Sequence, residues 1–212
     1  MRLVLASNNA KKLAELQTLL AGLPLNIVAQ AELGVAEADE PFHSFVENAL
    51  AKARHAALAS GGAAMADDSG LCVHALGGAP GVISAHFGGL LETLADEPRE
   101  ALRARQDATN NLALLARLHG VADRRAHFIS TLVAVRHAHD PEPLVAVGRW
   151  PGMVLRAPRG DQGFGYDPLM HIGDLDATVA ELDAARKNQH SHRARSAAVM
   201  RTMLAEVWHL AG

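Results

Sequence analysis

The fold class follows from residues 2–29, RLVLASNNAKKLAELQTLLAGLPLNIVA, whose pattern predicts a strand, a polar loop, a helix and a second strand. Residues 2–6 are a short apolar run typical of a buried strand. Leucines over residues 13–23 recur at the spacing of one helix face, and a glycine and a proline stop the helix before the apolar residues 25–29. Strands that alternate with helices predict an α/β core, in which ligands bind at the carboxyl ends of the strands.

A polar loop, SNNAKK at residues 7–12, joins the first strand to the helix. In an α/β core this loop lies at a helix N-terminus, where backbone amides and the helix dipole favour a bound anion. Lys12 adds a point positive charge. The alternative is a surface helix capped by asparagine and followed by a solvated lysine, because asparagine is a common N-cap residue.

Two adjacent carboxylates, Asp67 and Asp68, follow an apolar run and precede a Ser-Gly turn. Mg²⁺ prefers hard oxygen ligands, and one or two carboxylates usually complete its shell together with water and substrate phosphates. The pair therefore indicates a magnesium site. The alternative is a solvated turn, where aspartates are also common.

A second helix is predicted to begin at Ser44, because Glu47 stands three residues later in the pattern of a capping box. Asn48 and Lys52 are one turn apart, so they share a face of this helix. From spacing alone, that face either points into a cleft or is a solvated surface opposite Phe45 and the alanines.

The segment GFGYD at residues 163–167 places an aromatic ring between two glycines, which let a ligand approach the backbone. The phenylalanine can stack on a purine, a contact worth about 1–3 kcal/mol in single-stranded nucleic acids. The alternative is a turn anchored by two buried aromatics. Lys187, His192 and Arg193 supply cations and donors before a predicted C-terminal helix over residues 194–210, although a charged lead-in to a helix is usually solvated.

The remaining elements are predicted to be scaffold. A long helix over residues 98–119 carries Asp107 and Asn111 at positions i and i+4, which predicts a hydrogen bond on the helix surface. Alternating residues predict strands over 127–136 and 144–150, a hairpin that serves as scaffold or as a dimer surface.

Composition bounds the class of protein. The 212 residues, 49% of them hydrophobic, can bury one substantial core, and a net charge of −3 argues against a general nucleic-acid binder. A single cysteine, Cys72, fits a reducing compartment and offers no thiolate cluster for zinc. No apolar run reaches the roughly 18 residues of a membrane span. We therefore expect a soluble, cytoplasmic protein that binds neither nucleic acid nor membrane.

Together these motifs resemble the signature set of the inosine triphosphatase family, the pyrophosphatases that act on non-canonical purine nucleoside triphosphates. The resemblance runs from Leu3 to about Arg193, and the order and spacing of the motifs are more specific than any one of them. The motifs are SNNAKK (7–12), SFVENA with KA (44–53), ADDSGL (66–71), GGAPG (77–81), GFGYDP (163–168) and Lys187 with SHR (191–193).

The resemblance implies an α/β fold with a central mixed, twisted sheet flanked by helices. Two lobes of a single domain over residues 1–212 would surround an active-site cleft. The implied enzyme is a homodimer that cleaves ITP, dITP or XTP between the α- and β-phosphates to the nucleoside monophosphate and pyrophosphate. Its implied cofactor is Mg²⁺, which would neutralise the triphosphate while the protein positions water in line.

The resemblance also assigns roles to residues. Asp68 is the expected general base and a metal ligand, with Asp67 beside it and Glu40 completing the metal side. Donors aimed at a 6-oxo group would discriminate against adenine. The residues expected to bind the triphosphate are Ser7, Asn8, Asn9, Lys12 and Ser69, and Ala10 and Lys11 of the same loop are also expected to bind substrate. The residues expected to form the base and sugar pocket are Phe164, Gly165, Tyr166, Asp167, Lys187, His192 and Arg193.

Two positions depart from the family pattern, which usually has arginine at His86 and an acidic residue at His74. Histidine is largely neutral at pH 7, so the missing permanent charge at His86 bears on affinity and base preference. A non-catalytic nucleotide sensor with the same pocket is therefore an alternative, and a metal-dependent phosphatase or nuclease would use the same carboxylates. Products separate the three: pyrophosphate, no turnover, and orthophosphate or cleaved strands.

Overall fold

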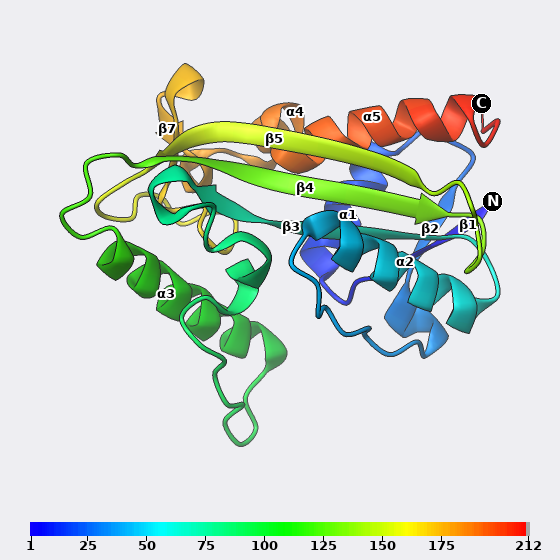
Figure 1. The fold of residues 1–212 in the computed structure, drawn as a ribbon, viewed down its shortest axis with the longest axis horizontal. Coiled ribbons are helices and arrows are strands. Elements are labelled where there is room, and N and C mark those ends of the chain that lie inside the picture. Colours follow the sequence, from blue (N-terminus) through cyan, green and yellow to red (C-terminus); the bar gives the residue numbers. More distant parts are fainter. Residues whose placement is uncertain (211–212) are drawn as a thin grey trace. The chain divides into compact units, whose positions relative to one another are not determined.

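The computed structural model describes residues 1–210, which form a seven-stranded mixed sheet flanked by helices (Figure 1). The strand order is β2-β1-β3-β4-β5-β6-β7. The strands are β1 (Arg2–Leu5), β2 (Asn26–Ala29), β3 (Ala64–Val73), β4 (Arg125–Val135), β5 (Leu144–Val154), β6 (Met170–Ile172) and β7 (Ala177–Thr178). The helices are α1 (Ala10–Leu19), α2 (Phe45–Ser60), α3 (Arg99–Arg117), α4 (Ala184–His190) and α5 (His192–Glu206). The predicted α/β class is confirmed, with β1 parallel to β2 and β3, and β6 antiparallel to β5 and β7.

The predicted strand, loop, helix and strand at the start of the chain are confirmed. β1 and β2 pair in parallel with Leu3 opposite Ile27, and α1 connects them. Asn9 is the N-cap of α1, and its side chain accepts hydrogen bonds from the amides of Lys11 and Lys12 at 3.0 and 3.3 Å. The cap fixes the residue at which the helix begins.

The predicted start of α2 at Ser44 is confirmed as well. The Glu47 amide donates to the Ser44 hydroxyl at 3.4 Å, and that hydroxyl donates to the Glu47 carboxylate at 2.6 Å. The carboxylate thus contacts the hydroxyl of Ser44, where a full capping box would have it accept from the Ser44 amide. Asn48 and Lys52 are 1% and 8% exposed, so the alternative of a solvated polar face is wrong.

Contacts between residues divide the chain into two compact units. Unit 1 contains residues 1–69, residues 129–149 and the segment that begins at His190, and unit 2 contains residues 70–128 and 150–189. Each unit has its own hydrophobic core. That the two units are lobes of a single domain stays a prediction.

Unit 1 is layered, because alternate residues of β1 pack into two different apolar clusters. Leu3 and Leu5 pack with Leu16 of α1 and Met200 of α5. Val4 packs instead with the alanines of α2. Successive strand residues point to opposite faces, so α1 and α5 cover one face of the strands and α2 covers the other. Figure 1 shows α2 and α5 on these opposite sides.

Unit 2 is built around α3. Leu114 of this helix and Leu118, its C-cap, are fully buried against Phe128, Trp150 and other apolar residues. The predicted long helix is confirmed in this unit, beginning one residue after Pro98.

The predicted C-terminal helix is confirmed in type, and its boundaries differ from those expected. It begins at His192 with Ser191 as N-cap and ends at Glu206, where residues 194–210 were expected. A further helix, α4, forms directly before it and was not predicted. None of the helices within residues 1–210 is long and apolar enough to cross a membrane.

Candidate active site

The two adjacent aspartates lie inside β3, and the prediction that a turn follows them is wrong. The strand continues past Gly70 to Val73, because Leu71 and Val73 are buried and extend its apolar pattern. Asp67 and Asp68 are only 1% and 5% exposed. Since successive residues of a strand point to opposite faces, the two carboxylates have different neighbours.

Asp68 shares a buried lysine with Glu40. The Lys52 ammonium, which α2 supplies, lies 3.0 Å from Asp68 Oδ1 and 3.0 Å from Glu40 Oε1. Burial, together with the negative charge of Glu40, raises the pKa of Asp68 to about 6 in spite of Lys52. The second carboxylate oxygen, Asp68 Oδ2, is buried and accepts no hydrogen bond. Asp68 is therefore an acceptor with one oxygen available for a proton or a cation.

Asp67 has the opposite environment. Lys12 Nζ lies 2.9 Å from Asp67 Oδ2, and Arg193 Nη2 lies 3.2 Å from the same oxygen. Ser130 donates to Asp67 Oδ1 at 2.7 Å, and Ser69 donates to Oδ2 at 3.1 Å. Burial alone would raise the pKa of Asp67, but Lys12 and Arg193 outweigh it and hold the pKa well below its ordinary value. Asp67 is thus a permanent anion that anchors two cations.

Arg193 lies in the first turn of α5 and is almost fully buried, at 1% exposed, so the alternative of a solvated, charged lead-in is wrong. Its guanidinium pairs with Glu15 of α1 as well as with Asp67, and it donates to the Ser69 hydroxyl at 3.2 Å. His192 and Lys187 are also buried, at 7% each. The structure therefore places Arg193 beside Asp67 and Ser69, with Lys12 on the same aspartate. Its expected role in the base and sugar pocket stays a prediction.

The polar loop before α1 combines both sequence interpretations. Asn9 caps the helix, as the alternative of an asparagine-capped surface helix predicted, and the Ser7 hydroxyl accepts from the Asn9 amide at 3.2 Å. Lys12 is no solvated surface residue, because its side chain is 18% exposed and reaches Asp67. Lys11 is exposed, and Asn8 is partly buried. Lys12 is the lysine of the pair that the fold directs at the aspartates.

The GFGYD segment in unit 2 holds a second group of predicted site residues. Asp167 Oδ2 accepts from the Phe164 amide at 3.0 Å and from Lys187 Nζ at 2.8 Å. Lys187 Nζ also lies 4.7 Å from the centre of the Phe164 ring. Tyr166 is buried, and its hydroxyl donates to the Ser84 carbonyl at 2.9 Å. Tyr166 is thus an anchored aromatic, whereas Phe164 is half-buried. Its expected role in binding the base stays a prediction.

Several residues of these networks were missed from the sequence. Lys52 was left undecided, yet it is the cation that joins Glu40 to Asp68. Glu15 was not considered, although its place three residues after Lys12 puts both on one face of α1 and is a usable signal. Ser130 lies 63 residues from Asp67, and no local pattern marks it.

The donors for a metal ion are fewer than the resemblance implied. Within residues 1–210, no three His, Cys, Asp or Glu side chains are placed to hold a metal together. Glu40 and Asp68 converge on one point, whereas both oxygens of Asp67 already accept hydrogen bonds. The roles of Glu40, Asp67 and Asp68 as metal ligands stay predictions.

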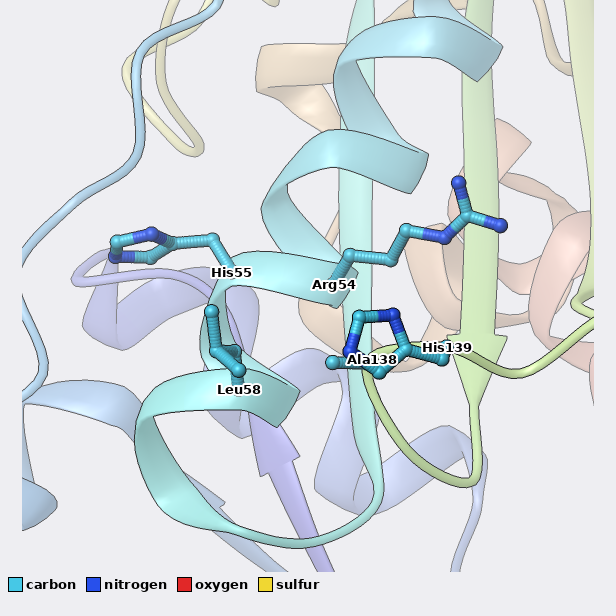
Figure 2. A pocket seen from close by; sticks show the side chains of 5 residues that line it. All are labelled: Arg54, His55, Leu58, Ala138 and His139. Carbon is cyan, nitrogen blue, oxygen red and sulfur yellow. The ribbon is translucent and has the colours of Figure 1, made fainter.

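A surface pocket of about 460 Å³ lies elsewhere in unit 1. Figure 2 shows its lining side chains, which come from α2 and from the turn after β4. It is lined by Arg54, His55, Leu58, Ala138 and His139. It contains no carboxylate and shares no residue with the predicted site.

Comparison with known proteins finds similarity over nearly the whole chain. The model of the Ham1 family matches residues 3–203. The dITP/XTP pyrophosphatase of Leptothrix cholodnii is 63% identical over 215 residues, covering 100% of both chains, and that of Methylibium petroleiphilum is 62% identical, covering 98% of this chain and 99% of the other. Among solved structures, a HAM1 protein from Coxiella burnetii superposes with a TM-score of 0.86 at 40% identity, over 97% of this chain and 99% of that one. The Staphylococcus aureus Ham1 protein superposes with a TM-score of 0.80 at 31% identity, over 96% and 98% of the two chains.

Proposed function

The chain belongs to the Ham1 family, and we propose that it is a pyrophosphohydrolase of non-canonical purine nucleoside triphosphates. It cleaves dITP, ITP or XTP between the α- and β-phosphates and releases the nucleoside monophosphate and pyrophosphate. The observation that carries this chemistry is the buried Asp68, whose Oδ2 has no hydrogen-bond partner and whose Oδ1 is fixed by Lys52.

Asp68 acts as the general base in this proposal. Its free Oδ2 takes a proton from water while the water oxygen bonds to phosphorus and the bridging P–O bond breaks. Lys12 offers a positive charge to the phosphates, and Asp67 fixes where that charge lies. A hydrolase needs a general base and a fixed positive charge for the phosphates. The two aspartates that provide for them lie on opposite faces of β3.

We propose that Glu40 and Asp68 would hold Mg²⁺, which supplies charge neutralisation for the triphosphate when bound. The donor set fits the ion, because two carboxylates lie close together and only one lysine balances their charge. The raised pKa of Asp68 shows that this negative charge is incompletely compensated. Water and phosphate oxygens would complete the shell.

Mg²⁺ is expected to stabilise the nucleotide-free protein more at about pH 8 than at about pH 5. Below its raised pKa of about 6, Asp68 is protonated, and a neutral carboxyl group is a poorer metal ligand than a carboxylate. We expect about 10 mM MgCl2 to raise Tm by roughly 2–4 °C at the higher pH, measured by thermal unfolding. An equal rise at both pH values, or an unchanged rise in Asp68→Asn, would contradict the assignment of Asp68 as a ligand.

The function is tested by turnover of purified protein with Mg²⁺ and the triphosphates of deoxyinosine, xanthosine, deoxyadenosine and deoxyguanosine. Pyrophosphate and orthophosphate are resolved for each substrate. Selective release of pyrophosphate from the first two supports the proposal. Tight binding without turnover would favour the nucleotide sensor, and orthophosphate would favour a phosphatase.

His86→Arg is expected to lower KM for dITP. His86 is exposed at the end of a short helical turn, Gly81–His86, and arginine would add a permanent positive charge that attracts a polyanionic substrate. An exposed charge contact of up to about 1 kcal/mol corresponds to a decrease of roughly 2–5-fold. His119→Arg adds the same charge to another exposed position of unit 2 and is the control. An unchanged or higher KM in steady-state kinetics would count against the prediction.

We propose further that the protein is a cytoplasmic homodimer. The dimer is supported by the family likeness, and the compartment by the single cysteine, Cys72. Light scattering during gel filtration should then give twice the chain mass of 22.4 kDa.

A further inference from the structure

Helix α3 holds one residue of the GFGYD segment from both sides. The Gly165 amide donates to Asp107 Oδ2 at 2.8 Å, and the Gly165 carbonyl accepts from Asn111 Nδ2 at 3.0 Å. Asp107 and Asn111 are one turn apart, so they present an acceptor and a donor on the same face of α3. The surface pair expected from the sequence is in fact a clamp on a loop more than 50 residues away.

The clamped loop has a narrowly defined backbone. Gly163 and Gly165 have φ of +80° and +62°, in the left-handed region that glycine tolerates best. A Cβ at Gly163 would lie 2.1 Å from Asp167 Oδ2, the oxygen that also accepts from the Phe164 amide. The clamp at Gly165 therefore lies directly beside Phe164, the aromatic residue of the loop.

The Phe164 ring is restricted on one face. Lys187 Nζ lies 4.7 Å from the ring centre, at cation–π distance, and Asp167 fixes the ammonium at 2.8 Å. The tilt of the ring depends on the backbone on either side of it, which Asp167 and the α3 clamp set. A purine that stacks on Phe164 would be oriented by that tilt.

Asn111 also carries an unsatisfied group. Its Oδ1 is buried and accepts no hydrogen bond, whereas its Nδ2 binds Gly165. A buried amide with one half unsatisfied costs free energy, so a role confined to stability is a poor account of it. The donor half is the half that the loop uses.

We propose that Asp107 and Asn111 are positioning residues for base selectivity, acting through Gly165. This inference rests on the proposed function, because it assigns the GFGYD loop to the purine base. A site that hydrogen-bonds a 6-oxo group discriminates only while its donors are aimed correctly, and small misplacements are costly. Loosening the clamp therefore lowers the preference for dITP over dATP more than it lowers turnover as such.

The test compares kcat/KM for dITP and dATP in three clamp variants. Asp107→Ala removes the acceptor for the Gly165 amide, and Asn111→Asp keeps its shape and loses the donor for the carbonyl. We expect the dITP/dATP ratio to fall about 10-fold or more in both, as the loss of about 1.4 kcal/mol of discrimination implies. Asp107→Asn keeps an acceptor and is expected to retain the ratio within about 3-fold.

Asn110→Asp is the matched control, since Asn110 is adjacent on α3 and binds the Ser84 and Ala85 carbonyls at 3.3 and 3.0 Å. It should lower thermal stability and leave the ratio unchanged. An unchanged ratio in Asp107→Ala and Asn111→Asp, or an equal fall in Asn110→Asp, overturns the proposal. If one clamp variant does not fold, the other decides.

Failure of the clamp proposal can be distinguished from failure of the proposed function. Wild-type protein that releases no pyrophosphate from dITP would refute the enzyme assignment. In that case the same ratio is measured as Kd for dITP against dATP by calorimetry, in the same variants. A ratio that falls about 10-fold supports the clamp in either case, and an unchanged ratio refutes it.

Discussion

Asp68→Asn is expected to lower kcat for dITP by at least about 10²-fold, the usual contribution of a general base. The side chain keeps its shape and its contact with Lys52, while the oxygen that would take the proton is replaced or made non-basic. KM should change much less, because Lys12 and Arg193 lie on the other carboxylate. The measurement is steady-state pyrophosphate release with Mg²⁺. Turnover within a few-fold of wild type would assign the base to another residue.

The loss can be separated from misfolding, because the same substitution should stabilise the metal-free protein. The pKa of Asp68 is raised in the folded state, so its ionisation opposes folding once the pH exceeds its ordinary pKa, and this cost is complete above about pH 6. Asparagine does not ionise. We expect a gain of roughly 1–3 kcal/mol in the free energy of unfolding at about pH 8 with chelator, and little difference at about pH 4. A destabilised variant at the higher pH would contradict this account.

The two aspartates illustrate how one strand creates two chemistries. Asp67 is surrounded by Lys12 and Arg193, which lower its pKa, while Asp68 is buried beside a second carboxylate, which raises its pKa. Carboxylates whose environments push their pKa values apart are typical of sites with divided roles. We infer that Asp67 organises the cations and that Asp68 handles the proton.

Local patterns predicted the parts of the fold that local physics determines. The N-cap at Asn9 and the helix start at Ser44 depend on side chains within four residues of each other. The strands over residues 2–5 and 26–29 are each marked by their own apolar run. Sequence periodicity carries this information directly. The end of β3 was misplaced, because the Ser-Gly pair after Asp68 has the composition of a turn and lies in a buried strand.

Distant partners account for what the sequence did not reveal. Arg193 resembles a solvated charge until Asp67, 126 residues away, is placed against it. Asp107 and Asn111 resemble a helix-surface pair until Gly165 is placed between them. Buried charge requires a specific partner, and only tertiary structure supplies one.

Arg193→Met is expected to cost about 3 kcal/mol or more in the free energy of unfolding. Arg193 is 1% exposed, and its removal leaves the buried Asp67 and the carboxylate of Glu15 with less compensating charge. Breaking a buried ion pair by removing one partner typically costs about 3–5 kcal/mol. Lys12 and Ser130 still contact Asp67, so the lower end of that range applies. Urea unfolding at neutral pH measures the change.

Arg125→Met is the control, because Arg125 pairs with Asp123 at 2.8 Å on the surface and its side chain is 68% exposed. A surface pair should contribute at most about 1 kcal/mol. If Arg193→Met cost no more than Arg125→Met, the buried network would not hold Asp67 in place. Glu15→Gln, made in wild type and in the Arg193→Met variant, then measures the contribution of the Glu15 pair to the free energy of unfolding. The loss should be smaller in the Arg193→Met variant, since the cation that Glu15 pairs with is gone.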